Sequence, residues 1–254
     1  MQLNYQSYGD GFPLIILHGL FGMLDNWHTV GKMLGEHFQV FLVDQRNHGR
    51  SPHSAELNYG LLADDIRDFI VQHLISSCFL LGHSMGGKVA MTVALKYPEL
   101  VARLIVVDIA PRSYPSFHDS ILGALTSLDL SSLASRQAID DALSVRIQEA
   151  PVRQFLMKNL ARNEDGSFRW KMNLSVISSK YQEILKEVDS NTPFSNPTLF
   201  VRSKKSSYIG EMDLSDIKRL FPHSTIVDFE TGHWVHAEAP GQLTNTVTEF
   251  LLQE

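Results

Sequence analysis

The sequence predicts an α/β protein in which helices cover both faces of a mostly parallel sheet. Short apolar runs without polar alternation recur along the chain, as expected for strands that are buried on both faces. Segments with apolar residues at helical spacing separate these runs, which favours crossover units and parallel strands. A chain of 254 residues, 44% of them hydrophobic and 20% charged, is long enough for one such domain with a large core.

Five strands are expected in the first 110 residues. The first, at residues 3–8, alternates weakly between polar and apolar side chains and is predicted to lie at an edge of the sheet. The other four are the apolar runs at residues 13–17, 40–44, 78–81 and 104–108. A helix is indicated between the third and fourth strands by apolar side chains at helical spacing, which are Tyr59, Leu62, Ile66, Phe69 and Ile70.

The alternation of strands and helices stops after Pro111. From Arg112 to Ser190 the apolar residues follow helical intervals without a strand signal, which predicts a helical insertion, or cap. Strands resume at residues 197–201 and 225–229, and a last helix is expected over 240–252, with Pro240 in its first turn. We therefore expect a core made of residues 1–111 and 191–254 and a cap at 112–190.

Composition excludes several classes of function. The net charge of −6 argues against binding to nucleic acid. The single cysteine, Cys78, lies in a predicted buried strand, so we expect neither a disulfide nor a cysteine metal site. No apolar run reaches the length that spans a bilayer, and residues 1–5 do not resemble a secretory signal. These features favour a cytoplasmic enzyme with a small-molecule substrate, as a monomer or homodimer.

Residues 82–86 read Gly-His-Ser-Met-Gly, a match to G-x-S-x-G between a predicted strand and a predicted helix. In that context the pattern indicates a strained turn that exposes Ser84 as a nucleophile at the top of the sheet. Gly82 and Gly86 are expected because side chains there would collide with the neighbouring strand and helix.

A serine nucleophile needs a base and a group that orients the base, here in the chain order serine, acid, histidine. His233 follows the last strand directly and is the predicted base, whereas His236 is expected to pack near the final helix. No carboxylate stands in residues 202–208, the loop directly after the strand that ends at Val201, where the acid often stands. Asp108, at the end of the neighbouring strand, is therefore the predicted acid, with Asp213 as the alternative.

The oxyanion of the reaction is expected to bind two backbone N–H groups. One belongs to Met85, the residue after the nucleophile. The other is assigned to Leu20 in the loop His-Gly-Leu-Phe-Gly at residues 18–22, with Phe21 as the neighbouring possibility and as a substrate contact. His18 is expected to fix this loop through hydrogen bonds.

The chain resembles the α/β-hydrolase superfamily in four stretches. They are residues 18–22, 44–51 and 82–87 and the Thr-Gly-His-Trp at 231–234. They are similar in particular to the small YbfF-type bacterial esterases, over nearly the whole chain. The resemblance implies an α/β-hydrolase fold with a helical cap inserted after the sixth strand. It also implies hydrolysis of carboxylic esters or thioesters, possibly acyl-CoA, through an acyl-serine intermediate without cofactor or metal.

Other functions occur in this superfamily. Ser84 argues against relatives that attack with aspartate, but carbon–carbon hydrolases and perhydrolases also use serine, and some relatives are receptors with a vestigial triad. Apolar residues near Ser84 favour short to medium acyl chains. Possible contributors from the cap are Phe117, Phe155, Trp170 and Met172, and a phosphorylated leaving group could contact Arg112, Lys204 and Lys205.

Overall fold

The computed structural model describes residues 1–253, and within them one sheet contains seven strands in the order β1-β3-β2-β4-β5-β8-β9. The edge strand β1 is antiparallel to β3, and every other neighbouring pair is parallel. The predicted class and the predicted edge strand are therefore confirmed. The strands are β1 (Tyr5–Tyr8), β2 (Pro13–Leu17), β3 (Gln39–Val43), β4 (Cys78–His83), β5 (Val101–Val107), β8 (Thr198–Ser203) and β9 (Ser224–Phe229).

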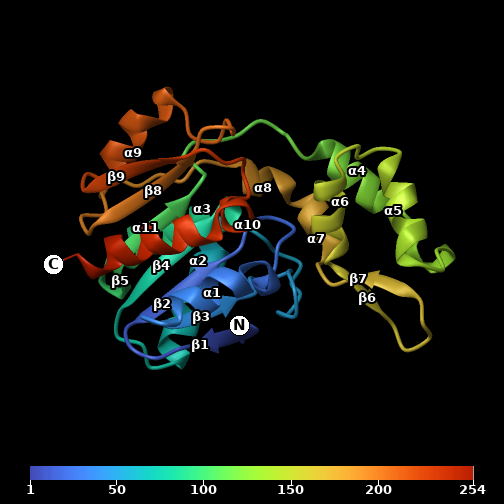
Figure 1. Ribbon diagram of the computed structural model, residues 1–254, viewed down its shortest axis with the longest axis horizontal. Helices are drawn as coiled ribbons and strands as arrows, with labels where there is room; N and C mark the ends of the chain where they lie inside the picture. The colour runs from blue at the N-terminus through green and yellow to red at the C-terminus, as the bar shows by residue number, and fades with distance from the viewer. Residues whose placement is uncertain (254) are drawn as a thin grey trace.

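Helices cover both faces of the sheet (Figure 1). Successive side chains of a strand point to opposite faces, so Leu14 and Ile16 of β2 join one apolar cluster while Ile15 and Leu17 join the other. The first cluster contains α1 (His28–Leu34) and α11 (Pro240–Leu252). The second contains α2 (Tyr59–Gln72), α3 (Met85–Lys96) and α9 (Leu214–Leu220).

Residues 112–190, which we call the cap segment, lie beyond the carboxyl ends of the parallel strands (Figure 1). Their helices are α4 (Asp119–Ser127), α5 (Arg136–Ser144), α6 (Ala150–Met157), α7 (Leu174–Ser179) and α8 (Tyr181–Leu185). Buried cap residues such as Leu122, Ile139 and Leu156 belong to the same apolar cluster as α2 and α3. The cap segment therefore packs on the core through continuous apolar contact.

Two expectations about the cap segment are wrong. It contains an antiparallel hairpin, β6 (Leu160–Arg162) and β7 (Phe168–Trp170), where the sequence predicts only helices. Each strand has three residues, too few to show alternation. The segment also follows the fifth strand rather than the sixth, because within residues 1–111 only β1 to β5 are formed.

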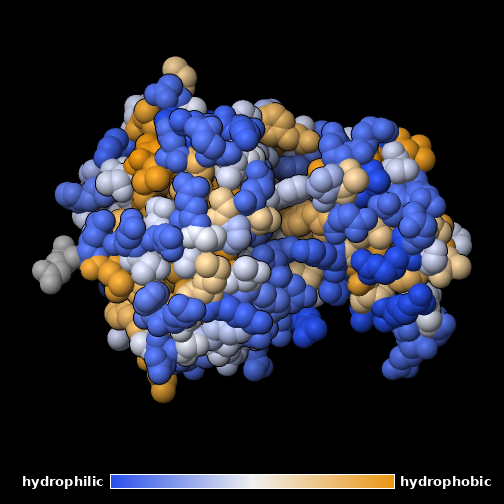
Figure 2. All heavy atoms as spheres, in the orientation of Figure 1, coloured by the Kyte–Doolittle hydropathy of each residue, from blue (hydrophilic) through white to orange (hydrophobic). Residues whose placement is uncertain are grey.

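The space-filling view shows a hollow between the core and the cap segment, with apolar side chains inside it (Figure 2). Within residues 1–253, no helix combines the length and the apolar character needed to cross a membrane.

Candidate active site

The turn between β4 and α3 holds Ser84 at φ 53° and ψ −122°, a strained conformation for a residue with a side chain. A Cβ atom on Gly82 would lie 2.1 Å from the carbonyl oxygen of Gly86, and one on Gly86 would lie 2.4 Å from that of Leu17 in β2. The collisions expected at these two positions, with the helix and with the neighbouring strand, are therefore confirmed. The two glycines allow α3 to begin directly against the sheet, and they keep Ser84 at the carboxyl end of β4.

Asp108 follows β5 and His233 follows β9, so the ends of the strands bring them together. The Nδ1 atom of His233 lies 2.8 Å from Oδ2 of Asp108, whose side chain is fully buried. A carboxylate accepts hydrogen bonds, so Nδ1 carries the proton and Nε2 of the neutral ring is left as a base. The backbone N–H of Ser203, at the end of β8, donates to Oδ1 (3.0 Å), and the hydroxyl of Ser206, in the loop after β8, donates to Oδ2 (2.6 Å).

Asp213, the alternative acid, makes other contacts. Its Oδ1 lies 2.9 Å from Nε of Arg112, and its Oδ2 accepts the backbone N–H of Gly210 at 2.7 Å. These two contacts occupy both oxygens, and neither involves His233. The geometry therefore favours Asp108.

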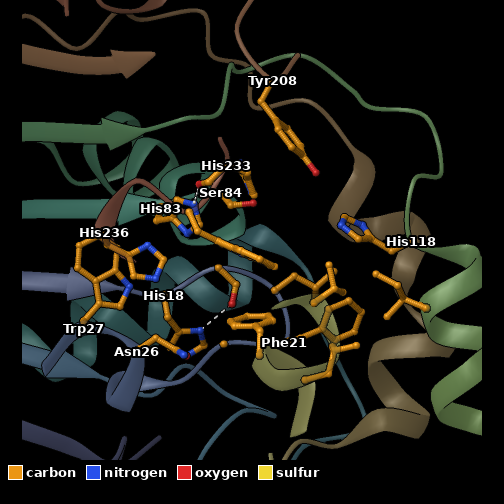
Figure 3. A pocket seen from close by; sticks show the side chains of 18 of the residues that line it. His18, Phe21, Asn26, Trp27, His83, Ser84, His118, Tyr208, His233 and His236 are labelled. Carbon is orange, nitrogen blue, oxygen red and sulfur yellow. Dashed lines mark hydrogen bonds between the residues drawn. The ribbon is translucent and has the colours of Figure 1, made fainter. Parts of the chain in front are cut away.

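Ser84 and His233 line the same cavity and lie side by side at one end of it (Figure 3). No hydrogen bond joins the two side chains in this structure, and such contacts often shorten only when substrate is bound. The backbone carbonyl of His233 accepts a hydrogen bond from Nε2 of His83 at 2.8 Å. The ring of Tyr208 stacks on the His233 ring, with ring centroids 4.1 Å apart. These contacts hold His233 on two sides.

The loop after β2 forms a tight turn in which the N–H of Gly22 donates to the carbonyl of Gly19 at 3.0 Å, with Phe21 at φ 60°. The N–H groups of the central residues, Leu20 and Phe21, take no part in that bond. Leu20 lines the cavity beside Ser84, and the N–H of Met85, at the first position of α3, has no intrahelical acceptor. These backbone groups are available for an oxyanion.

His18 holds this loop, as the sequence predicts. The backbone N–H of Gln45 donates to its Nε2 (3.1 Å), so its Nδ1–H donates to the carbonyl of Gly19 (2.8 Å). The side chain of Gln45 also donates to the His18 carbonyl at 2.6 Å. Burial lowers the pKa of His18 to about 4, which keeps the ring neutral.

His236 lies in α10 (Val235–Glu238), directly before the final helix, and its ring makes a contact that the sequence does not predict. It stacks on Trp27 with ring centroids 4.6 Å apart, and it lines the cavity. Burial, followed by the nearby His233, lowers the pKa of His236 to about 3, so it stays neutral beneath the base. The sequence offers no sign of this stack, because residues 27 and 236 meet only in the fold.

The cavity between the core and the cap segment has a volume of about 410 Å³, within the range of small-molecule sites. Several residues that line the cavity are not predicted from the sequence as site residues. They come from the loop after β2 (Asn26, Trp27), from the cap segment (His118, Ile121, Val152, Leu156) and from the residues around the base (Tyr208, Trp234). Trp234 could have been inferred from its place directly after His233, whereas His118 has no distinguishing neighbours.

The cap residues considered from the sequence divide into two groups. Phe155 lines the large cavity, and Phe117 lines a smaller adjoining pocket. Trp170 lines a separate surface hollow, and Met172 is buried in the apolar core. Those two do not contribute to the candidate site.

Two of the three cations considered for a phosphorylated leaving group have other partners. Arg112 pairs with Asp213, and Lys204 lies 2.9 Å from Glu230. Neither Arg112, Lys204 nor Lys205 lines the large cavity. Within residues 1–253 no group of three or more His, Cys, Asp or Glu side chains is arranged to hold a metal ion.

A serine on a strained turn, a histidine held by a buried carboxylate and free N–H groups beside the serine form the constellation of a serine hydrolase. The chain belongs to the α/β-hydrolase family: the family model described as alpha/beta hydrolase fold matches residues 13–240. Relatives of the chain bear the names esterase and lipase, and the chain is a carboxylesterase-type hydrolase.

Two curated relatives and one solved structure illustrate the similarity. The chain is 38% identical to the sn-1-specific diacylglycerol lipase ABHD11 of Danio rerio, over 97% of this chain and 80% of the relative. It is 31% identical to esterase YbfF of Escherichia coli, over 97% of this chain and 95% of that relative. The structure titled "Marine microorganism esterase" is 40% identical and superimposes with a TM-score of 0.96, covering 98% of this chain and 99% of that one.

Proposed function

We propose that this hydrolase cleaves carboxylic esters with short to medium acyl chains through an acyl intermediate on Ser84, with His233 as the base and Asp108 as the group that orients it. The observation that supports the proposal most strongly is the 2.8 Å contact between His233 and a fully buried Asp108, at the end of a cavity that Ser84 also lines. A serine hydroxyl becomes a useful nucleophile only beside such a pair.

In the proposed reaction, Nε2 of His233 takes the proton of Ser84 while Oγ attacks the ester carbonyl carbon. The N–H groups of Leu20 and Met85 stabilise the oxyanion. Nε2 then gives the proton to the alcohol oxygen as the C–O bond breaks. Water attacks the acyl-serine by the reverse sequence of proton transfers and releases the carboxylic acid.

The size and lining of the cavity support the substrate range. A volume of about 410 Å³, with apolar walls such as Phe21, Phe155 and Trp234, favours uncharged acyl and alcohol groups of moderate size. Esters of glycerol are candidates because relatives bear the name diacylglycerol lipase. Thioesters, acyl-CoA included, have the same reacting carbonyl, but the pairing of Lys204 with Glu230 makes these substrates the less favoured ones.

We further propose that residues 112–190 act as the lid of the site, carried by a core of residues 1–111 and 191–254. Phe21 is proposed as a substrate contact. A cytoplasmic location and a monomeric or homodimeric state stay predictions from the sequence.

The test is hydrolysis of p-nitrophenyl esters of graded acyl length, with acyl-CoA thioesters alongside, by the wild type and by Ser84→Ala. We expect highest activity with short to medium acyl chains, its loss in Ser84→Ala, and its retention in Ser127→Ala, which removes an exposed hydroxyl of α4. A fluorophosphonate should label the wild type and not Ser84→Ala. Binding of esters without turnover or labelling would instead indicate a receptor.

A further inference from the structure

His118 enters the active-site cavity from the cap segment and has no part in the reaction described above. It lies just before α4 and lines both the large cavity and a smaller pocket of about 30 Å³ that also reaches Ser84. Figure 3 shows its ring pointing away from the cap backbone into the space in front of Ser84. Its position makes it a group that a bound substrate would touch.

The hydrogen bonds of His118 define its tautomer. Its backbone N–H donates to the hydroxyl oxygen of Tyr181 at 3.1 Å, and its Nδ1 lies 2.7 Å from the same oxygen. Since that oxygen already accepts the backbone N–H, we assign its proton to the bond with Nδ1. Burial lowers the pKa of His118 to about 4, so the ring is neutral at pH 7. A neutral ring whose Nδ1 is an acceptor carries its proton on Nε2.

The resulting Nε2–H has no hydrogen-bond acceptor among residues 1–253. The ring of Phe21 meets the His118 ring edge to face, with centroids 5.8 Å apart, and Ile121 lies on the same wall. His118 is half-buried and its Nε2–H is open to the cavity, so it can donate to an acceptor on a bound ligand. The hydroxyl of Tyr208 likewise makes no hydrogen bond within these residues, and it points toward the same space (Figure 3).

We propose that His118 determines specificity by donating its Nε2–H to a second oxygen of the substrate, on the alcohol side of the scissile ester bond. This inference rests on the proposed function. His233 must give its proton to the leaving alcohol oxygen, so the alcohol leaves on the side of His233. His118 lines the same cavity as His233, so a polar group on the alcohol can reach the His118 ring. The preferred substrates are therefore esters of alcohols that carry a further hydroxyl, ether or ester oxygen.

The test compares 2-methoxyethyl butyrate with n-butyl butyrate, which differ only by an ether oxygen in place of a methylene. The ether accepts hydrogen bonds and donates none, so it reports on the donor alone. We expect the wild type to favour the methoxyethyl ester in kcat/KM by about three- to tenfold, the range that one hydrogen bond provides. The preference should vanish in His118→Phe and persist in part in His118→Gln, whose amide N–H can reach a similar position.

Two further variants separate this role from a structural one. Ile121→Val trims the same wall without changing a donor and should leave the ratio of the two kcat/KM values as in the wild type. Tyr181→Phe removes the proton that defines the tautomer, so it should lower the ratio and change the ¹⁵N chemical shifts of the His118 ring.

The outcomes distinguish this inference from the proposed function. If no ester is hydrolysed, the proposed function fails. If both esters are hydrolysed but the wild type does not discriminate, or His118→Phe keeps the full preference, the role of His118 is wrong. A preference for ethers in the acyl group, shown with methoxyacetyl against butyryl esters, would overturn the assignment to the alcohol side.

Discussion

At the scale of single residues, the contact between Asp108 and His233 carries the most chemistry. Asp108→Asn keeps the shape but replaces the acceptor Oδ2 with a group that can donate, so the histidine proton moves to Nε2 and the base is lost. We expect kcat for a p-nitrophenyl ester to fall by about 10⁴-fold, as in other triads. Steady-state kinetics with the variant and an active-site titration would measure the loss.

Asp213→Asn is the matched control, because this second carboxylate binds Arg112 and the N–H of Gly210 rather than the base. It should keep kcat within a few-fold of the wild type. The reverse result, a large loss in Asp213→Asn with Asp108→Asn nearly intact, would show that the acid is misassigned.

Lys88, in α3, is a buried cation that the proposed reaction does not use. Its Nζ donates to the carbonyl of Lys186 and lies 4.7 Å from the ring centroid of Tyr114. Burial lowers the pKa of Lys88 to about 7, with Arg112 lowering it further and Glu187 opposing. Between pH 7 and the usual value near 10.5, the unfolded chain binds the proton and the folded chain does not, so stability rises with pH.

The free energy of unfolding of the wild type relative to Lys88→Met should therefore increase from pH 7 to pH 9.5, by about 1 to 3 kcal/mol. Urea unfolding at both pH values measures this difference, and comparison with the variant cancels the other titrating groups. Parallel pH dependence of the two proteins would show that Lys88 keeps an ordinary pKa in the fold.

At the scale of elements, the junction of β4 and α3 depends on close backbone contact. In Gly86→Ala the new methyl group would lie 2.4 Å from the carbonyl oxygen of Leu17, and backbone cannot yield as a side chain can. We expect a loss of more than about 2 kcal/mol in the free energy of unfolding, together with a loss of activity. Thermal and urea unfolding would measure it.

Gly241→Ala is the control, since a Cβ there meets nothing within 4 Å and the position lies in the first turn of α11. It should be neutral or stabilising by up to about 1 kcal/mol. Equal losses in the two variants would mean that the packing of the turn against β2 does not matter.

The same elements show what a sequence reveals. The strands of the large sheet and the helices at residues 59–72 and 240–252 are predicted well, because burial on both faces or on one stripe leaves a long periodic signal. The hairpin β6–β7 was missed because three-residue strands carry almost no period. Its turn, Asn163 to Gly166, has residues that are equally typical of the end of a helix.

Within the candidate site, the local motifs placed Ser84, and chain order placed His233. Asp108 could be inferred because residues 202–208, directly after Val201, contain no acid. The structure shows that this part of the chain instead donates hydrogen bonds to Asp108. The roles of His118 and the stack of His236 on Trp27 depend on contacts between distant segments. No local pattern records such contacts.

At the scale of the whole molecule, the cap segment and the core are joined by specific hydrogen bonds as well as apolar contact. The hydroxyl of Tyr59 donates to the carbonyl of Ile184 at 2.7 Å, and the backbone N–H of Asn173 donates to the backbone carbonyl of Asn47 at 2.8 Å. A third bond reaches the active site directly. The side-chain amide of Asn159, fully buried in the cap segment, donates to the carbonyl of Phe21 at 2.7 Å.

This last bond couples the position of the cap segment to the turn whose Leu20 N–H is proposed to bind the oxyanion. In Asn159→Ala the Phe21 carbonyl loses its buried donor and the turn loses its tie to the cap. We expect kcat to fall by about tenfold with a smaller change in KM, because the oxyanion donor acts mainly in the transition state. Asn163→Ala, which removes a hydrogen bond to Ser167 inside the same hairpin region, should leave kcat unchanged. Steady-state kinetics on one ester, together with the unfolding temperatures of both variants, would test this comparison. A kcat in Asn159→Ala equal to that of the wild type would show that the cap covers the site without helping to arrange it.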